Sequence, residues 1–183
     1  MDERSQAAVD RFDPRPTLVR RGLAFIVAGS SQALMRGGNT IEMRHAERLE
    51  DARRRGRGLL TLANHVSLFD DPWLTACLSS AQWSSLRWIA ADALNFFGSP
   101  LKAAIFNAGK CVPIVRGAGL DQPGMHFLVE RLEAGDWVHF FPEGTRTRNP
   151  DGSMQALKPG FAHLIRAARP VVLPFHHLSL IHI

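Results

Sequence analysis

The sequence has little cysteine and no long apolar run. Cys77 and Cys111 are its two cysteines, which are too few for a disulfide framework and lack the spacing of metal ligands. We expect both thiols to be reduced and buried as small apolar groups. The apolar runs fall well short of the roughly 20 residues that a membrane-spanning helix requires. The sequence therefore predicts neither a disulfide-stabilised domain nor a spanning segment.

Two kinds of functional motif are also missing. No Gly-x-Ser-x-Gly nucleophile elbow is present, which disfavours Ser67 as a catalytic serine. No zinc-finger, RNP-type or glycine-clamp motif accompanies the net charge of +5, which disfavours nucleic acid as a partner. A basic protein without such motifs favours an anionic membrane surface as its polyanionic partner.

With 45% hydrophobic and 21% charged residues, the chain has the composition of one folded domain. Residues 1–16 are polar and are expected to be flexible. They lack the pattern of a secretory signal, which predicts a location on the cytosolic face. Residues 17–36 combine apolar side chains with Arg20 and Arg21, which predicts an amphipathic helix. This helix either lies in a bilayer interface or packs on the core of the domain that follows at 37–183.

The most informative segment is a turn that holds a histidine and an aspartate five positions apart. An apolar strand is predicted before it, at Leu59–Ala63, and Asp71 followed by Pro72 is typical of the start of a helix. A neutral imidazole that donates one ring N–H to a carboxylate is held in one tautomer, so its other nitrogen can accept a proton from a hydroxyl. His65 and Asp70 are therefore candidates for a general base and its orienting carboxylate. The alternative is a hydrogen-bonded pair with a structural role.

Two further apolar strands lead into polar residues. The residues that follow them and are candidates for ligand binding are Arg116, Glu143, Gly144, Thr145 and Arg146. Guanidinium groups suit phosphate oxygens because their N–H donors form a fork, and a glycine lets the backbone approach a ligand closely. These segments predict an anion site. The alternative is a solvated loop in which Glu143 pairs with one of the arginines.

Helical and strand patterns alternate along the chain. Strands are predicted at Thr40–Met43, Leu59–Ala63, Leu86–Ala90, Gly109–Val115, Trp137–Phe141 and Val171–Phe175. Helices are predicted at 45–55, 72–80, 92–107 with a break at Gly98–Pro100, 123–134 and 159–168. This alternation predicts an α/β fold with a mostly parallel central sheet flanked by helices. Ligands of such sheets bind outside the carboxyl ends of the strands. His65, Arg116 and Glu143 all follow strands, which is why we expect them in one site.

Four blocks carry a resemblance to a known family. They are Asn64–Asp70, Gly109–Gly117, Phe141–Arg146 and Val171–Phe175. With these blocks in this order, the chain resembles the glycerophospholipid acyltransferase family, which includes lysophosphatidate and glycerol-3-phosphate acyltransferases. The doubled Asp70-Asp71 also resembles the tafazzin branch, whose members move acyl chains between phospholipids and lysophospholipids. Residues 143–146 are instead more similar to bacterial enzymes that depend on an acyl donor.

The resemblance implies an O-acyltransferase. Such an enzyme moves a fatty acyl chain from an acyl thioester, or from a phospholipid, to the hydroxyl of a lysophospholipid or a glycerol phosphate. His65 would be the general base and Asp70 its partner, and the residues that bind the acceptor would be Asn64, Arg116, Glu143, Gly144, Thr145 and Arg146. No metal or bound cofactor is implied, since acyl-coenzyme A or acyl-carrier protein would be a co-substrate. Peripheral or monotopic association with the cytosolic face of a membrane is expected.

Two other classes of function stay open at this point. A metal-dependent hydrolase could use His65, Asp70, Asp71 and Glu143 as ligands. A non-catalytic lipid-binding module could depend on the basic surface and the first helix alone. Residues 178–183 resemble translated read-through of a sequencing adaptor, and family members continue past the fourth block. We therefore expect the acyltransferase domain, residues 37–183, to be incomplete at its C-terminus.

Overall fold

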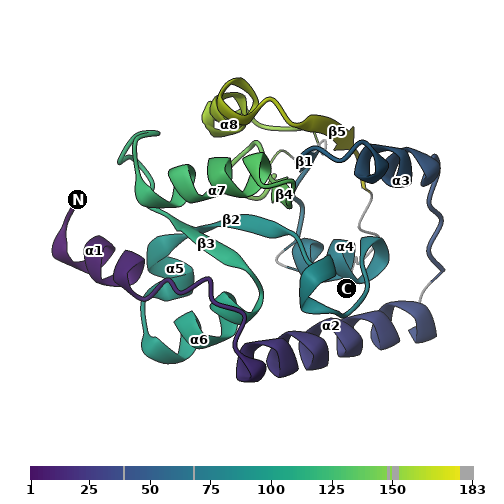
Figure 1. Ribbon diagram of the computed structural model, residues 1–183, viewed down its shortest axis with the longest axis horizontal. Coiled ribbons are helices and arrows are strands. Elements are labelled where there is room, and N and C mark those ends of the chain that lie inside the picture. The colour runs from purple at the N-terminus through teal and green to yellow at the C-terminus, as the bar shows by residue number, and fades with distance from the viewer. Residues whose placement is uncertain (39, 68, 148, 150–152, 178–183) are drawn as a thin grey trace.

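The computed structural model describes residues 1–38, 40–67, 69–147, 149 and 153–177, so the expected read-through tail at 178–183 lies outside the described residues. Its centre is a five-stranded sheet (Figure 1). The strands are β1 (Leu59–Ala63), β2 (Trp88–Asp92), β3 (Cys111–Ile114), β4 (Trp137–Phe140) and β5 (Val171–Phe175). They lie in the order β3-β2-β4-β1-β5, and every neighbouring pair is parallel. The predicted α/β fold with a parallel sheet is confirmed.

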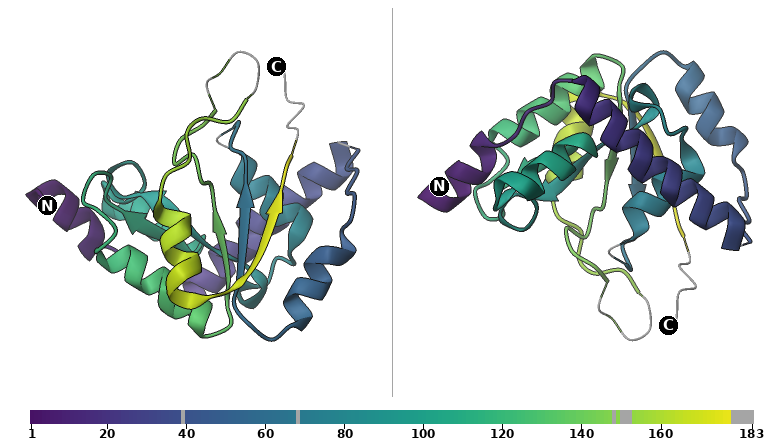
Figure 2. Two further views of the ribbon diagram at one scale, coloured as in Figure 1. Left: turned by 90° about the horizontal axis from the view of Figure 1, so that it is seen from above. Right: turned by 90° about the horizontal axis from the view of Figure 1, so that it is seen from below.

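Helices cover both faces of this sheet (Figures 1 and 2). They are α1 (Glu3–Asp10), α2 (Leu18–Gly38), α3 (Glu47–Arg54), α4 (Asp70–Leu78), α5 (Ala93–Phe97), α6 (Pro100–Ala108), α7 (Pro123–Glu133) and α8 (Gly160–Ala168), with a short 3₁₀ turn at Trp83–Ser85. Helices α7 and α8 cover one face, while α4, α5 and α6 cover the other. Helix α2 packs on α4 and α6 from outside, and therefore forms an outer layer.

The main core lies between the sheet and α7 with α8. Because side chains alternate across a strand, Leu60 and Val138 point to this core, where they pack with Leu128, Leu132 and Leu164. All five side chains are essentially inaccessible to solvent. The same alternation sends the intervening residues of β1 and β4 to the opposite face, beneath α4. That second face forms the floor under the candidate site.

Two segments at the N-terminal end differ from what the sequence suggests. Residues 3–10, expected to be flexible, form α1, in which the Asp2 carboxylate accepts a hydrogen bond from the Ser5 N–H at 2.7 Å and Ala8 is fully buried. The N-cap and this buried alanine stabilise a helix that the polar composition did not suggest. The strand expected at Thr40–Met43 does not form, and Ile41 and Met43 are exposed instead. The segment has an alternating pattern but does not lie beside an edge strand with which it could pair.

Helix α2 confirms the helix expected at 17–36 and extends to Gly38. Its inner face is narrow, because Ala24 and Ala28 pack there against Ala81 and Leu86. Its outer face is apolar as well, with Leu18, Val19, Phe25, Ile26, Val27 and Leu34 exposed. Among the described residues, no helix has both the length and the apolar character needed to cross a bilayer.

Candidate active site

His65 and Asp70 lie at the carboxyl end of β1, as predicted. The His65 Nδ1 and the Asp70 Oδ2 are 3.0 Å apart. The same carboxylate oxygen accepts hydrogen bonds from the backbone N–H groups of Val66, at 2.6 Å, and Ser67, at 2.8 Å. The turn therefore folds around one oxygen of Asp70, which is also the first residue of α4. The predicted proximity of the pair is confirmed, while its catalytic role stays a prediction.

The surroundings of Asp70 keep its side chain ionised. Burial favours the neutral acid, but the hydrogen bonds from His65, Ser67 and Val66 and the nearby His177 outweigh it, so that the pKa of Asp70 lies below its ordinary value of 3.8. An ionised carboxylate can only accept, so the His65 Nδ1 carries the proton of the shared hydrogen bond. The Nε2 lone pair of His65 is then available to a substrate.

The His65 ring is also held by packing. It stacks on the ring of Phe141, with centroids 4.1 Å apart and planes 14° from parallel. Its side chain is 18% exposed, whereas that of Asp70 is 1% exposed. The pair therefore has one buried partner, which orients the ring, and one partner that reaches the surface. This is the arrangement that a general base needs, since only the imidazole has to meet the substrate.

Glu143 lies beside this turn. Its side chain is buried, and its Oε1 accepts hydrogen bonds from the His65 backbone N–H at 3.2 Å and from the Thr147 hydroxyl at 2.9 Å. Its Oε2 accepts from the Gln155 backbone N–H at 2.9 Å. Protein donors occupy both carboxylate oxygens of Glu143, and its expected contact with a headgroup stays a prediction. Glu143 joins the turn after β1 to the loop after β4.

Asn64 is also occupied by the protein. It is buried, its side-chain amide donates to the His177 carbonyl at 2.9 Å, and its Oδ1 accepts from the His177 backbone N–H at 2.9 Å. These bonds join the end of β1 to the residues after β5, and the expected contact of Asn64 with substrate stays a prediction. The His177 Nε2 also lies 3.6 Å from the Asp70 Oδ2. Only the order of the strands, which places β5 next to β1, could have shown this contact.

The two arginines expected in one anion site lie apart. Arg116 follows β3, which is separated from β1 by β2 and β4, a distance of roughly 14 Å at ordinary strand spacing. Its Nε is bonded to the Asp92 Oδ2 at 2.7 Å. Arg146 follows β4, the neighbour of β1, is exposed, and has no ion pair with a described residue. Arg116 is therefore paired at the edge of the sheet formed by β3, and its role in binding the acceptor stays a prediction.

The loop that carries Arg146 begins with a tight turn. Gly144 has a φ of +66°, a conformation that favours glycine, and its N–H donates to the Phe141 carbonyl at 3.0 Å. Thr145 is partly buried in the same turn. Further along, the Thr147 N–H donates to the His65 carbonyl at 2.6 Å. The loop is thus bonded directly to the turn of the candidate base.

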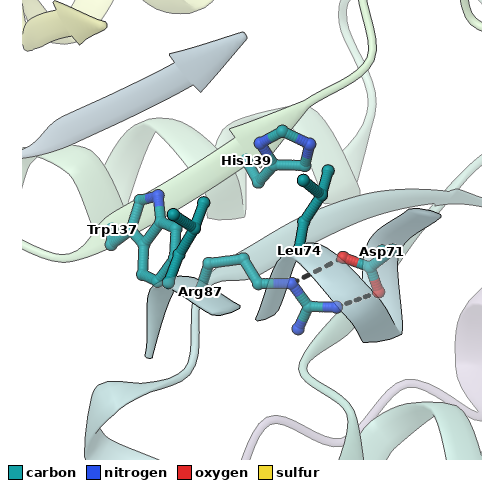
Figure 3. A pocket seen from close by; sticks show the side chains of 6 residues that line it. Asp71, Leu74, Arg87, Trp137 and His139 are labelled. Atoms are coloured by element: carbon teal, nitrogen blue, oxygen red, sulfur yellow. Dashed lines mark hydrogen bonds and ion pairs between the residues drawn. The ribbon is translucent and has the colours of Figure 1, made fainter. Parts of the chain in front are cut away.

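The floor under the site is a set of polar groups that sequence reasoning missed. Figure 3 shows Asp71 and Arg87 joined side by side, next to Trp137 and His139. The Arg87 Nε donates to the Asp71 Oδ1 at 2.7 Å, its Nη2 bonds the Asp71 Oδ2, and its Nη1 donates to the Gly109 carbonyl at 2.7 Å. Asp71 therefore attaches the start of α4 to the sheet. The side chains lining this crevice leave no room for a water molecule, so we do not place substrate there.

His139 is part of this floor and stays neutral. Its Nδ1 lies 2.8 Å from the Thr61 hydroxyl, which in turn accepts from the Trp137 Nε1 at 2.8 Å. Burial lowers the pKa of His139 to about 3, with a further contribution from the positive charge of Arg87. Because it is buried and uncharged at neutral pH, His139 packs under the site and does not serve as a second base.

The four residues considered as metal ligands do not converge. Asp71 is bonded to Arg87, while the carboxylates of Asp70 and Glu143 accept hydrogen bonds from protein groups. In the described part of the chain, no group of three or more His, Cys, Asp or Glu side chains could hold a metal ion. The geometry therefore favours a histidine held by a carboxylate over a metal site.

The chain is similar in sequence to several known proteins. The chain is 34% identical over 172 residues to N-acylphosphatidylethanolamine synthase of Arabidopsis thaliana, an alignment that covers 90% of this chain and 58% of that protein. It is 36% identical over 130 residues to Tafazzin of Drosophila melanogaster, covering 68% and 34%. It is 29% identical over 180 residues to Taffazin of Dictyostelium discoideum, covering 91% and 62%.

This chain therefore spans between about a third and three fifths of the length of these relatives. A family model described as Acyltransferase matches residues 41–177, a range that runs from the segment before α3 to the end of the described chain and includes His65, Asp70, Glu143 and His177. The chain belongs to the acyltransferase family.

Proposed function

We propose that the protein is an O-acyltransferase that moves a fatty acyl chain to the hydroxyl of a lysophospholipid or a glycerol phosphate. One observation carries this proposal: the His65 imidazole is bonded to a buried, ionised Asp70 through Nδ1, at 3.0 Å, so Nε2 is available as a base. Membership of the acyltransferase family supports the reaction class. The names of the relatives support a phospholipid as substrate.

The proposed reaction begins with the acceptor hydroxyl next to the His65 Nε2. As the hydroxyl oxygen forms a bond to the acyl carbonyl carbon, its proton moves to Nε2. The tetrahedral intermediate then collapses, the bond to the leaving group breaks, and the imidazolium returns its proton to that group. Asp70 stabilises the imidazolium between these two steps through the hydrogen bond to Nδ1. No covalent acyl-enzyme is needed.

The identity of the leaving group depends on the donor. With acyl-coenzyme A or acyl-carrier protein as co-substrate, the leaving group is a thiolate. With a phospholipid donor, as in a transacylase of the tafazzin type, it is the hydroxyl oxygen of the resulting lysophospholipid. The same base serves both routes, because each one transfers one proton to Nε2 and back. We therefore propose base catalysis by His65 for both donor classes, and the assay described below identifies the donor.

We propose that Arg146 binds the phosphate of the acceptor. It is exposed, it follows the strand next to β1, and it forms no ion pair with any described residue. The turn at Gly144 and the bond from the Thr147 N–H to the His65 carbonyl hold its loop beside the base. A guanidinium group with free donors suits a phosphate better than one that is already paired, as Arg116 is.

We propose peripheral association with a membrane, which the outer surface of α2 supports. Leu18, Val19 and Ile26 lie on this helix and are 85%, 80% and 63% exposed, an apolar surface that favours a bilayer interface. Phe69, which is 58% exposed, stacks on Trp73 of α4, the helix that links α2 to the His65 turn. We propose that this surface collects lipid substrates. Location on the cytosolic face stays a prediction.

A second candidate function comes from one relative. The name N-acylphosphatidylethanolamine synthase describes a product in which the acyl chain is attached to nitrogen. A neutral amine can take the place of the hydroxyl at the His65 Nε2, since both must lose a proton as they attack. Transfer to the nitrogen of phosphatidylethanolamine is therefore the alternative acceptor reaction on the same site.

The test is an assay of the purified chain with vesicles. Lysophospholipids, glycerol 3-phosphate and phosphatidylethanolamine are each offered with acyl-coenzyme A, acyl-carrier protein and phospholipid donors, and products are identified by mass spectrometry. We expect an ester product, and we expect His65→Ala and Asp70→Asn to reduce turnover at least 100-fold while the thermal transition is retained. An amide product supports the second candidate. Normal turnover in either variant rejects the mechanism, and vesicle binding without transfer from any donor supports a lipid-binding module.

A further inference from the structure

His177 meets the candidate site from the opposite side to Glu143. Its backbone N–H and carbonyl are bonded to the Asn64 side chain, at 2.9 Å each. These bonds extend the parallel pairing of β1 with β5 beyond its last register pair, Ala63 with Phe175. The backbone of residue 177 is therefore fixed by Asn64 whatever side chain the residue carries.

The His177 imidazole reaches further than its backbone. Its Nε2 lies 2.8 Å from the Asn64 carbonyl oxygen and 3.6 Å from the Asp70 Oδ2. Because a carbonyl oxygen can only accept, this Nε2 carries a proton. The ring is 14% exposed. The titratable groups near it are Asp70, whose pKa it helps to lower, and the buried His139, whose pKa it also helps to lower.

The peptide group between Asn64 and His65 is consequently held at both of its polar atoms. Its carbonyl oxygen accepts from the His177 Nε2 at 2.8 Å, and its N–H donates to the Glu143 Oε1 at 3.2 Å. This peptide group sets the direction of the bond from Cα to Cβ in His65, and therefore the position of the imidazole. A misplacement of about 1 Å at a reacting group can cost on the order of 100-fold in rate.

We propose that His177 is a positioning residue for acyl transfer. It fixes the Asn64 carbonyl and places an N–H dipole against the carboxylate of Asp70, and through both contacts it aims the His65 imidazole. This inference rests on the proposed function. The contacts of His177 hold the peptide group before His65, which the His65–Asp70 pair does not do alone. They are possible because β5 lies next to β1.

The test compares three variants with the wild-type chain. His177→Leu fills similar space without a donor, and His177→Gln supplies an amide N–H that can occupy the position of Nε2. His176→Leu is the matched control, because His176 is the exposed neighbour. Since Asn64 bonds to the backbone of residue 177, the pairing of β1 with β5 persists in each variant, and thermal unfolding checks this.

We expect His177→Leu to lower kcat 10- to 100-fold while KM for donor and acceptor stays within about twofold, because the contact acts on the base and not on substrate. His177→Gln should recover kcat to within about threefold of wild type, and His176→Leu should be unchanged. In proton NMR spectra, the low-field signal of the His65 Nδ1–H should persist in His177→Gln and broaden or disappear in His177→Leu.

Three results would overturn the role of His177. They are wild-type kcat in folded His177→Leu, an equal loss in the Leu and Gln variants, and a rise in KM with unchanged kcat, which would make His177 a substrate contact. His65→Ala is measured in the same assay. An active His65→Ala variant rejects the proposed mechanism itself, whereas an inactive one combined with a fully active His177→Leu variant rejects the positioning role alone.

Discussion

The backbone N–H of His65 donates a hydrogen bond to the Oε1 of Glu143 at 3.2 Å. Glu143 is 1% exposed, and its other oxygen accepts from the Gln155 backbone N–H at 2.9 Å. One buried carboxylate thus joins the turn that carries the base to both ends of the loop that follows β4. A residue that looks like a ligand contact in the sequence is in the structure a connection between two loops.

Glu143→Gln should weaken this connection. The His65 and Gln155 N–H groups donate to different oxygens of Glu143, so an amide must turn its NH₂ toward one of them. We expect a loss of about 1–3 kcal/mol in the free energy of unfolding, together with a fall in kcat of about 10-fold and an unchanged KM. Urea unfolding and steady-state kinetics measure these quantities, with Glu133→Gln at the exposed end of α7 as the control. Wild-type stability would contradict the account.

The ion pair of Asp71 with Arg87 should carry a larger share of stability. Arg87 has 5% of its side chain exposed, and its donors reach both oxygens of Asp71 and the Gly109 carbonyl. Asp71→Ala leaves this buried cation without its carboxylate, so we expect a loss of about 3 kcal/mol on urea unfolding. Asp51→Ala removes an exposed aspartate of α3 and should change stability by less than about 1 kcal/mol. Equal losses in the two variants would argue against a role for the buried pair.

The sequence could predict the features that depend on neighbours in the chain. Short apolar segments that alternate with helical patterns were sufficient to predict a parallel α/β sheet, because the strands of such a sheet are short and largely buried. The contact of His65 with Asp70 spans five residues, and so it follows from local geometry. The inner alanines of α2 confirm that the helix packs on the domain, whereas its exposed Ile26 leaves contact with a bilayer as a prediction.

The sequence could not predict features that depend on the order of the strands. His177 meets Asp70 because β5 lies next to β1, whereas Arg116 follows the edge strand β3, which β2 and β4 separate from β1. The local sequence pattern does not predict these positions. In a parallel sheet all strands have their carboxyl ends on the same side, and the pattern does not say which strands are neighbours. The role of Glu143 was missed for a related reason. A polar residue after a strand looks the same in sequence whether its partners are substrate atoms or a distant loop.

Buried His139 should make the protein less stable in acid. Its pKa is lowered to about 3 by burial, so the unfolded chain, with an ordinary pKa of about 6.5, takes up a proton that the folded protein does not. The stability that neutral His139 contributes is present above pH 6.5 and is lost as the pH falls toward 3, by about 3 kcal/mol at pH 4. His139→Asn, which can still bond the Thr61 hydroxyl, should flatten this part of the pH dependence. Parallel curves for variant and wild type in urea unfolding would contradict the assignment.

Arg146 and Arg116 should differ in their effect on the acceptor. Arg146 forms no ion pair within the described ranges and follows the strand next to β1, so Arg146→Ala should raise KM for a phosphate-bearing acceptor about 10-fold with little change in kcat. Arg116 is bonded to Asp92 three strands from β1, so Arg116→Ala should change KM by less than about twofold. Steady-state kinetics with varied acceptor measure both. A larger effect of Arg116→Ala than of Arg146→Ala would indicate that the phosphate binds near the end of β3 instead.

The outer face of α2 should bind vesicles through its apolar side chains. Ile26 is 63% exposed, and burying such a side chain in a bilayer interface contributes about 1.5–3 kcal/mol. Ile26→Asp should therefore reduce binding to vesicles that contain anionic phospholipid by 10-fold or more in a sedimentation assay. The thermal transition should be unchanged, because the side chain packs on nothing in the core. Ser30→Asp adds the same charge to an exposed position of α2 without removing an apolar group. If both variants lose binding equally, charge repulsion explains the effect and insertion of the helix does not. If neither does, α2 is not the surface that meets the membrane.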